Sequence, residues 1–306
     1  MSNFKKNMKK MATNKMLYIM IVPCMIYTFI FSYYPLNGWI MAFQNFKPAK
    51  GYAGSEFVYF DQFKFLFKDI EFWRSVRNTL AMSLMNLVFS FVFAIVFALL
   101  LNEIKNVRFK KITQTVSYLP HFLSWIIVCS LVSNMLSTND GAVNNLLMSL
   151  GIVDKPVLWL AEPKFFWWIT TFANIWKETG WNSIIYIAAI AGIDQSMYEA
   201  ADLDGANRFQ KMLHITLPGI RPTIVVLLIM NLGWVMNASF EVPYILGNGV
   251  LVDVSQTIDI FVLKYGMSIG NYSLATAAGI FKSVISLFLV FVTNAIANKL
   301  GENSLM

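Results

Sequence analysis

Polar side chains recur at regular intervals inside long apolar stretches of this 306-residue chain. In the stretch 165–193, Asn174, Glu178 and Asn182 are spaced four residues apart, which places them on one face of a helix, with Trp181 beside them. Lys177 is the neighbour of Glu178. An ionisable group at membrane depth is strongly unfavourable if it faces lipid, so these side chains must face protein or water.

The stretches 220–246 and 275–297 repeat this pattern. If the first is one helix, five of its polar and aromatic residues fall within an arc of about 140°. They are Asn231, Trp234, Asn237, Glu241 and Tyr244. In the second stretch, Lys282 shares a narrow face with Ser286 and Thr293. Three helices with one polar face each can enclose a cavity, either as a hydrogen-bonded network between helices or as the lining of a path for a polar solute.

Aromatic rings beside amides and carboxylates suit a sugar, because a pyranose face stacks on a ring while its hydroxyls need donors and acceptors. Candidate ring platforms are Trp181, Trp234, Phe240 and Tyr244. The same residue types are also common in packing and at membrane interfaces. Glu178 and Glu241 balance Lys177 and Lys282, which predicts a nearly neutral cavity. A neutral cavity disfavours a strongly anionic solute but does not exclude uronates.

The composition is that of an integral membrane protein. Hydrophobic residues make up 57% and charged residues 13% of the chain, and the mean hydropathy is +0.56. Six stretches approach or exceed the roughly 20 residues that cross a bilayer. They are 16–36, 78–101, 115–136, 165–193, 220–246 and 275–297. We expect an all-α protein with six transmembrane helices in one transmembrane domain, 16–306, after a basic tail, 1–15.

The first stretch is interpreted as a retained helix, since it is long enough to span and no A-x-A cleavage site follows it. With the amino terminus in the cytoplasm, the inner segments hold thirteen Lys and Arg residues and the outer segments nine. This bias favours that orientation and places the loop 194–219 in the cytoplasm. The net charge of +7 arises from basic residues at the ends of apolar stretches, which argues against nucleic-acid binding.

The sequence offers little for catalysis. No G-x-x-x-x-G-K-[ST] motif is present, so the chain is not expected to bind ATP by itself. The histidines are His121 and His214, and the cysteines, Cys24 and Cys129, lie within apolar stretches, so we expect no metal site and no disulfide. We therefore predict a chain without catalytic residues, metal or cofactor of its own.

The loop 196–218 has the pattern of two short helices. Ser196 and Glu199 have the spacing of a capping box, and Gly205 is suited to a left-handed helix stop. An apolar stripe then leads to Pro218. Its members are Phe209, Met212, Leu213, Thr216 and Leu217. The small side chains of Ala200 and Ala201 would let a partner surface approach closely.

This loop resembles the EAA loop of binding-protein-dependent ABC importer permeases. The resemblance lies in Glu199-Ala200-Ala201, Asp204-Gly205-Ala206 and Ile215-Thr216-Leu217-Pro218. Four further stretches resemble the Gram-positive polysaccharide and oligosaccharide branch of the maltose-permease-like carbohydrate family. They are Phe31 to Pro48, Leu99 to Lys111, Thr115 to Trp125 and Ile175 to Asp194.

The resemblance implies the six-helix type I ABC importer permease fold in a bacterial, Gram-positive plasma membrane. It implies a heterodimer with a second homologous permease, two ATPase subunits that bind ATP and Mg²⁺, and a lipid-anchored extracytoplasmic solute-binding protein. Oligosaccharides or polysaccharide fragments would be imported by alternating access. A cytoplasmic coupling helix would contact the ATPase through Glu199, Ala200, Ala201, Asp204, Gly205 and Ala206.

Two other functions remain open at this point. The first is a permease of the same class for a non-sugar solute, such as a glycerol-phosphate ester. The second is an ion-coupled secondary transporter, although such a protein needs no cytoplasmic docking loop and normally has more spans. A membrane-embedded enzyme is disfavoured further, because no nucleophile and base are found together.

Overall fold

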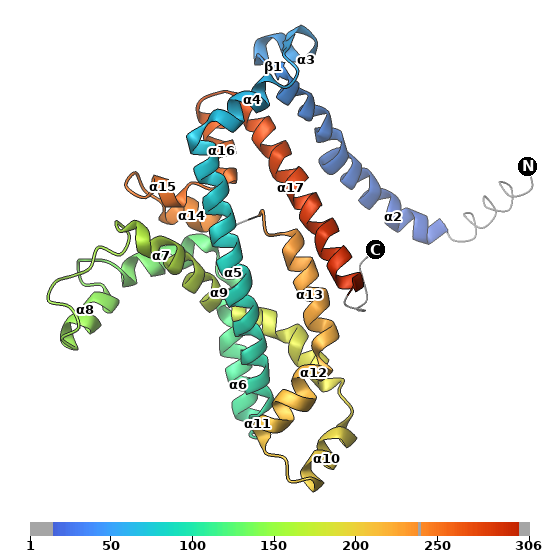
Figure 1. Ribbon diagram of the computed structural model, residues 1–306, viewed down its shortest axis with the longest axis vertical. Helices are drawn as coiled ribbons and strands as arrows, with labels where there is room; N and C mark the ends of the chain where they lie inside the picture. The colour runs from blue at the N-terminus through green and yellow to red at the C-terminus, as the bar shows by residue number, and fades with distance from the viewer. Residues whose placement is uncertain (1–14, 238–239, 300–306) are drawn as a thin grey trace, which may run out of the picture.

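The computed structural model describes residues 15–237 and 240–299, and its architecture is helical (Figure 1). The long helices are α2 (Lys15–Thr28), α5 (Ile70–Asn102), α9 (Pro163–Ala191), α13 (Arg221–Gly233) and α17 (Tyr272–Lys299). By length and apolar composition, Lys15–Phe43, Ile70–Asn102 and Tyr272–Ala295 could each cross a membrane, and two bent helix pairs bring the possible total in the described part to five. The expected count of six spans stays a prediction.

Helices α5 and α9 form the central pair of the molecule and lie side by side (Figure 1). They pack through a buried cluster in which Ala94 and Ala98 of α5 meet Tyr186 and Ile190 of α9. The small alanine side chains let the two backbones approach closely. The Asp69 carboxylate caps α5 by accepting a hydrogen bond from the Glu71 N–H at 2.7 Å.

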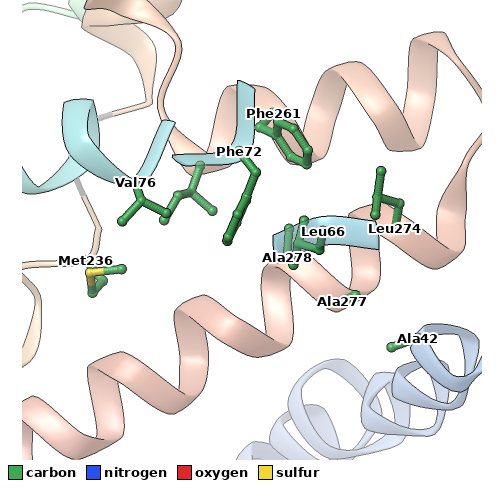
Figure 2. Packing of buried hydrophobic residues seen from close by; sticks show 10 residues of the cluster. Ala42, Leu66, Phe72, Val76, Met236, Phe261, Leu274, Ala277 and Ala278 are labelled. Carbon is green, nitrogen blue, oxygen red and sulfur yellow. The ribbon is translucent and has the colours of Figure 1, made fainter. Parts of the chain in front are cut away.

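A second core joins α5 to α17 and to two short helices at one end of the molecule (Figure 2). Phe72 of α5 and Phe261 of α16 (Ile258–Leu263) contact edge to face, with ring centroids 5.7 Å apart. Leu66 of α4 (Asp61–Lys68) and Ala277 of α17 complete this layer. Elements that are far apart in the sequence are therefore joined at this end.

The predicted third span, 115–136, is not one straight helix. The segment 115–136 is divided among α6 (Val107–Tyr118), the 3₁₀ turn η4 (Leu119–Phe122) and α7 (Trp125–Met135), and the helices on either side of the break meet at 101°. Pro120 has no N–H to continue the helical hydrogen bonds, and the Ser124 hydroxyl caps a new helix at the Ile127 N–H. We call residues 117–122 the elbow.

The predicted fifth span is also interrupted. Helix α13 ends at Gly233, and α14 (Glu241–Leu246) begins after the gap in the described residues. Helix α13 itself follows the preceding helix at an angle of 58°. The shared arc predicted for Asn237, Glu241 and Tyr244 is therefore wrong, because it needs one continuous helix.

The remaining elements are short. They are η1 (Phe29–Tyr33), η2 (Tyr34–Phe43), β1 (Gln44–Asn45), η3 (Pro48–Lys50), α3 (Gly51–Gly54), β2 (Glu56–Phe57), α8 (Ala142–Ser149), α10 (Gln195–Leu203), α11 (Arg208–Lys211), η5 (Met212–Thr216), α12 (Leu217–Gly219), α15 (Val252–Ser255) and η6 (Lys264–Ser268). Strands β1 and β2 pair antiparallel, with Gln44 opposite Phe57. This sheet lies at one end of the molecule, and α10 and α11 lie at the other (Figure 1).

Candidate solute cavity and coupling surface

Helices α5, α9 and α13 line a polar cavity of about 340 Å³, together with residues just after α13. Its polar lining consists of Ser83, Asn86, Ser90, Asn174, Glu178, Asn182, Tyr186, Asn231, Trp234 and Asn237. Most of these polar groups are amides and hydroxyls, and each of these two kinds of group can both donate and accept hydrogen bonds. The cavity therefore suits an uncharged, hydroxyl-rich part of a solute.

The α5 side of the cavity has unused hydrogen-bonding capacity. The Ser90 hydroxyl donates to Asn174 Oδ1 at 2.9 Å and ties α5 to α9. Ser83 Oγ and Asn86 Oδ1 are buried and make no hydrogen bond to the described protein groups. A buried polar atom without a partner costs about 1–3 kcal/mol. A solute hydroxyl that reached these atoms would remove that cost.

A charged cluster stands at the α9 side of the cavity. Glu178 accepts from Lys177 Nζ at 2.9 Å through Oε1, and its Oε2 lies 2.7 Å from His121 Nδ1. Lys177 also donates to the His121 carbonyl oxygen at 2.7 Å. The His121 ring stacks on Trp181, with centroids 4.3 Å apart and planes within 2°. The cluster thus joins α9 to the elbow.

Six of the ten residues predicted for the solute pathway line this cavity. They are Asn174, Glu178, Asn182, Asn231, Trp234 and Asn237. The other four lie elsewhere: Trp181 stacks on His121, and Tyr244 stacks on Phe240 with centroids 4.9 Å apart. Lys282 forms an ion pair with Asp259 at 2.6 Å, and Glu241 is the first residue of α14.

The α5 wall was not predicted from the sequence. Ser83, Asn86 and Ser90 are spaced three and four residues apart within the apolar stretch 78–101. That spacing is a helical period and could have identified the polar face. The partners of Lys177 could not have been identified in this way, since His121 is 56 residues away along the chain.

The first helix of the coupling segment, residues 194–219, begins earlier than its sequence pattern indicates. Asp194, and not Ser196, caps α10, and its carboxylate accepts from the Ser196 N–H at 2.9 Å. The backbone and side-chain hydrogen bonds from Ser196 hold the pKa of Asp194 below its usual value. The predicted capping box at Ser196 and Glu199 is replaced by one at Asn207 and Gln210, which begins α11.

The predicted left-handed stop at Gly205 is confirmed, because its φ is +75°. The Ala206 N–H donates to the Ala201 carbonyl at 2.9 Å, and the Gly205 N–H donates to the Asp202 carbonyl at 3.2 Å. These two bonds form a Schellman motif, which ends the helix and satisfies its last carbonyl groups.

The second half of the coupling segment is one helical run with a π turn, η5, in its middle. The π turn changes the helical register, so the predicted stripe is divided: Phe209 is exposed, whereas Thr216 is buried. The Thr216 hydroxyl lies 2.9 Å from the Tyr198 hydroxyl and connects this run to α10. The helix ends at Gly219, one residue after the predicted stop.

The surface presented by α10 is open to a partner. Glu199, Ala200, Asp204 and Gly205 are exposed, while Ala201 and Ala206 are half-buried. Leu203, the last residue of α10, is 91% exposed. The six predicted coupling residues therefore lie together at one end of the protein (Figure 1).

The chain is similar in sequence to known proteins along almost its whole length. Protein LplB of Bacillus subtilis (strain 168) is 41% identical over 298 residues, which cover 97% of this chain and 93% of that protein. The polygalacturonan/rhamnogalacturonan transport system permease protein YteP of the same organism is 40% identical over 301 residues, covering 98% of this chain and 93% of that protein.

A solved structure is similar over almost the whole fold. It is the crystal structure of a bacterial ABC transporter involved in the import of the acidic polysaccharide alginate, and one of its chains matches with a TM-score of 0.88 and 38% identity. The match covers 96% of this chain and 99% of that chain. A family match described as binding-protein-dependent transport system inner membrane component spans residues 82–302. This chain therefore belongs to the family of binding-protein-dependent transport system inner membrane components, the membrane-integral permeases of ABC importers.

Proposed function

We propose that this chain is one membrane subunit of an ATP-driven importer that moves oligosaccharides or polysaccharide fragments into the cytoplasm. The observation that carries this proposal is the cavity between α5, α9 and α13. Its wall offers amides and hydroxyls, and the exposed indole of Trp234 offers a face on which a sugar ring can stack.

The relatives support a carbohydrate as the solute. YteP is named for polygalacturonan and rhamnogalacturonan transport, and the similar crystal structure belongs to an alginate importer. A second crystal structure of an alginate ABC transporter, in complex with an alginate pentasaccharide-bound periplasmic protein, also matches this chain with a TM-score of 0.88. We propose that a comparable extracytoplasmic protein delivers the glycan to the end of this chain that carries β1 and β2.

The coupling segment would receive the energy of ATP hydrolysis. In the proposed importer, ATP and Mg²⁺ bind to two separate ATPase subunits, and a second homologous permease pairs with this chain. The ATPase contacts the exposed face of α10 around Glu199 and Gly205. Closure of the ATPase pair then moves this face, and the cavity opens alternately to the two sides of the membrane. The amino terminus lies in the cytoplasm in this arrangement.

Transport into proteoliposomes tests the proposal. The complete importer is reconstituted with its ATPase, second permease and binding protein, and ATP-dependent uptake of labelled plant or algal oligosaccharides is measured. Asn182 lines the cavity and is exposed, so Asn182→Leu removes a polar contact without a folding cost. We expect uptake at low substrate concentration to fall about two- to tenfold, the range that the loss of one solute hydrogen bond allows.

Asn145→Leu is the matched control, because Asn145 is an exposed amide on α8 and lies outside the cavity. Uptake by this variant should equal that of the unmodified importer. If both variants transport normally, the cavity is not the solute path. If glycerol phosphate is taken up and oligosaccharides are not, the solute class is wrong although the transporter class is right.

A further inference from the structure

Glu178 is the one carboxylate among the described residues that line the cavity. Both of its oxygens are occupied: Oε1 by Lys177 Nζ at 2.9 Å and Oε2 by His121 Nδ1 at 2.7 Å. Lys177 and His121 are not among the described residues that line the cavity. A solute therefore meets a carboxylate whose charge is already balanced by the protein.

The balancing groups are firmly held in place. Lys177 is 5% exposed, donates to the His121 carbonyl and lies with its ammonium 5.0 Å from the ring centre of Trp125. His121 is fixed by stacking on Trp181. An ammonium that is buried and bonded on several sides cannot turn away from Glu178 without leaving a buried charge unpaired. The pairing is therefore a permanent part of the cavity wall in this conformation.

The other lysine that was expected to act in the pathway does not reach this cavity. Lys282 is paired with Asp259 at 2.6 Å. The sign of the electrostatic potential inside the cavity therefore depends on Lys177 and Glu178 together. Two unit charges about 6 Å apart, at an effective dielectric constant near 20, change the affinity of a site about a hundredfold. Removing either charge would therefore change strongly how the cavity receives a charged solute.

We propose that Lys177, assisted by His121, determines the charge class of the glycan by neutralising Glu178, and that the cavity thereby admits sugars that carry carboxylates. An unbalanced Glu178 would repel a uronate, whereas the balanced pair lets amides and hydroxyls bind it as they bind a neutral sugar. This inference rests on the proposed function and names the acidic glycans within it. It also sharpens the expectation from the sequence, in which a neutral cavity disfavoured a strongly anionic solute but did not exclude uronates.

The experiment compares two probes of equal length, a galacturonate trisaccharide and a neutral galactose trisaccharide, in the reconstituted importer. The quantity measured is the ratio of their uptake rates, normalised to the amount of assembled complex. Lys177→Met leaves Glu178 unbalanced and should lower the acidic-to-neutral ratio at least about tenfold. Glu178→Gln leaves Lys177 unbalanced and should raise the ratio.

Lys282→Met is the control, because it breaks an ion pair outside the cavity and should leave the ratio unchanged. A purely structural role for the cluster would lower both rates together and would overturn the inference, as would a ratio that moves in the same direction in both cavity variants. If the Lys177→Met chain does not assemble into the importer, the Glu178→Gln variant decides by itself. A raised acidic-to-neutral uptake ratio then supports the inference, and an unchanged or lowered ratio overturns it. If the unmodified importer transports neither probe and hydrolyses ATP in response to neither, the proposed function itself is wrong.

Discussion

Gly205 shows how much one residue contributes to the coupling surface. Its φ of +75° lies in the left-handed region, and the space beside it is empty, since no heavy atom lies within 4 Å of the position a Cβ would take. The requirement for glycine is therefore a property of the backbone and not of packing. A β-branched side chain here would strain the turn that ends α10.

We predict that Gly205→Val abolishes most ATP-driven uptake while the chain still inserts and assembles. A β-branched residue in the left-handed region costs about 1–2 kcal/mol, so the turn opens locally. The measurement is uptake per ATP hydrolysed in proteoliposomes. Gly205→Asn should retain most activity, because asparagine tolerates this conformation.

Gly270→Val is the matched control for this prediction. Gly270 also has a positive φ, +79°, and open space beside it, but it precedes α17 and lies far from α10 along the chain. It should carry a similar local strain without altering the ratio of uptake to ATP hydrolysis. Equal loss of that ratio in both variants would refute a special role for Gly205.

At the scale of elements, the elbow depends on close contact between α6 and α9. A Cβ on Gly180 would overlap the carbonyl oxygen of Ser117, and the next residue, Trp181, stacks on His121. Lys177 holds the elbow through the His121 carbonyl. A short stretch of α9, about one helical turn, therefore shapes a break in another span.

We predict that Gly180→Ala destabilises the protein by about 1–3 kcal/mol, because two backbones must move apart to accept one methyl group. A lower thermal midpoint of the purified complex in detergent would record this effect. Gly279→Ala is the control, since Gly279 is also within a helix but has no neighbour within 4 Å of the position that an added methyl group would take. The same midpoint for both variants would contradict the prediction.

What the sequence could predict differed from element to element. The helices around 78–101 and 165–193 were found because their apolar length and polar spacing are local signals. The division of 220–246 at Gly233 was missed, because an isolated glycine is tolerated within a helix and only tertiary contacts decide its effect. The Lys177–His121 pairing was beyond reach for the same reason, since it depends on how distant segments pack.

At the scale of the whole molecule, the cavity and the coupling segment share one rigid connection. Only three residues, Gly192 to Asp194, separate α9 from α10. Ile193 is also in close contact with Gly219, where a Cβ would lie 2.7 Å from Ile193 Cδ1. Both ends of the coupling segment are thus joined tightly to each other and to the helix that carries Glu178.

We predict that two glycines inserted after Ile193 separate ATP hydrolysis from uptake. A flexible joint would absorb the displacement of α10 before it reaches α9. ATP hydrolysis should continue, either still stimulated by the solute-loaded binding protein or no longer dependent on it. Uptake should fall at least about tenfold. The same insertion after Gly249, in an exposed loop between α14 and α15, should preserve coupling; equal uptake in both insertions would disprove the rigid connection.

The break at Gly233 has a consequence for engineering the solute range of this protein. Helix α9 leads into α10, and α13 begins at Arg221, just after the other end of the coupling segment. In the proposed importer, a substitution within either helix would therefore also act on the ATPase cycle. Trp234 and Asn237 line the same cavity but follow the end of α13, beyond the point where the helix is interrupted. Substitutions at these two positions are therefore the better starting point for a transporter with a different cargo and unchanged ATP consumption.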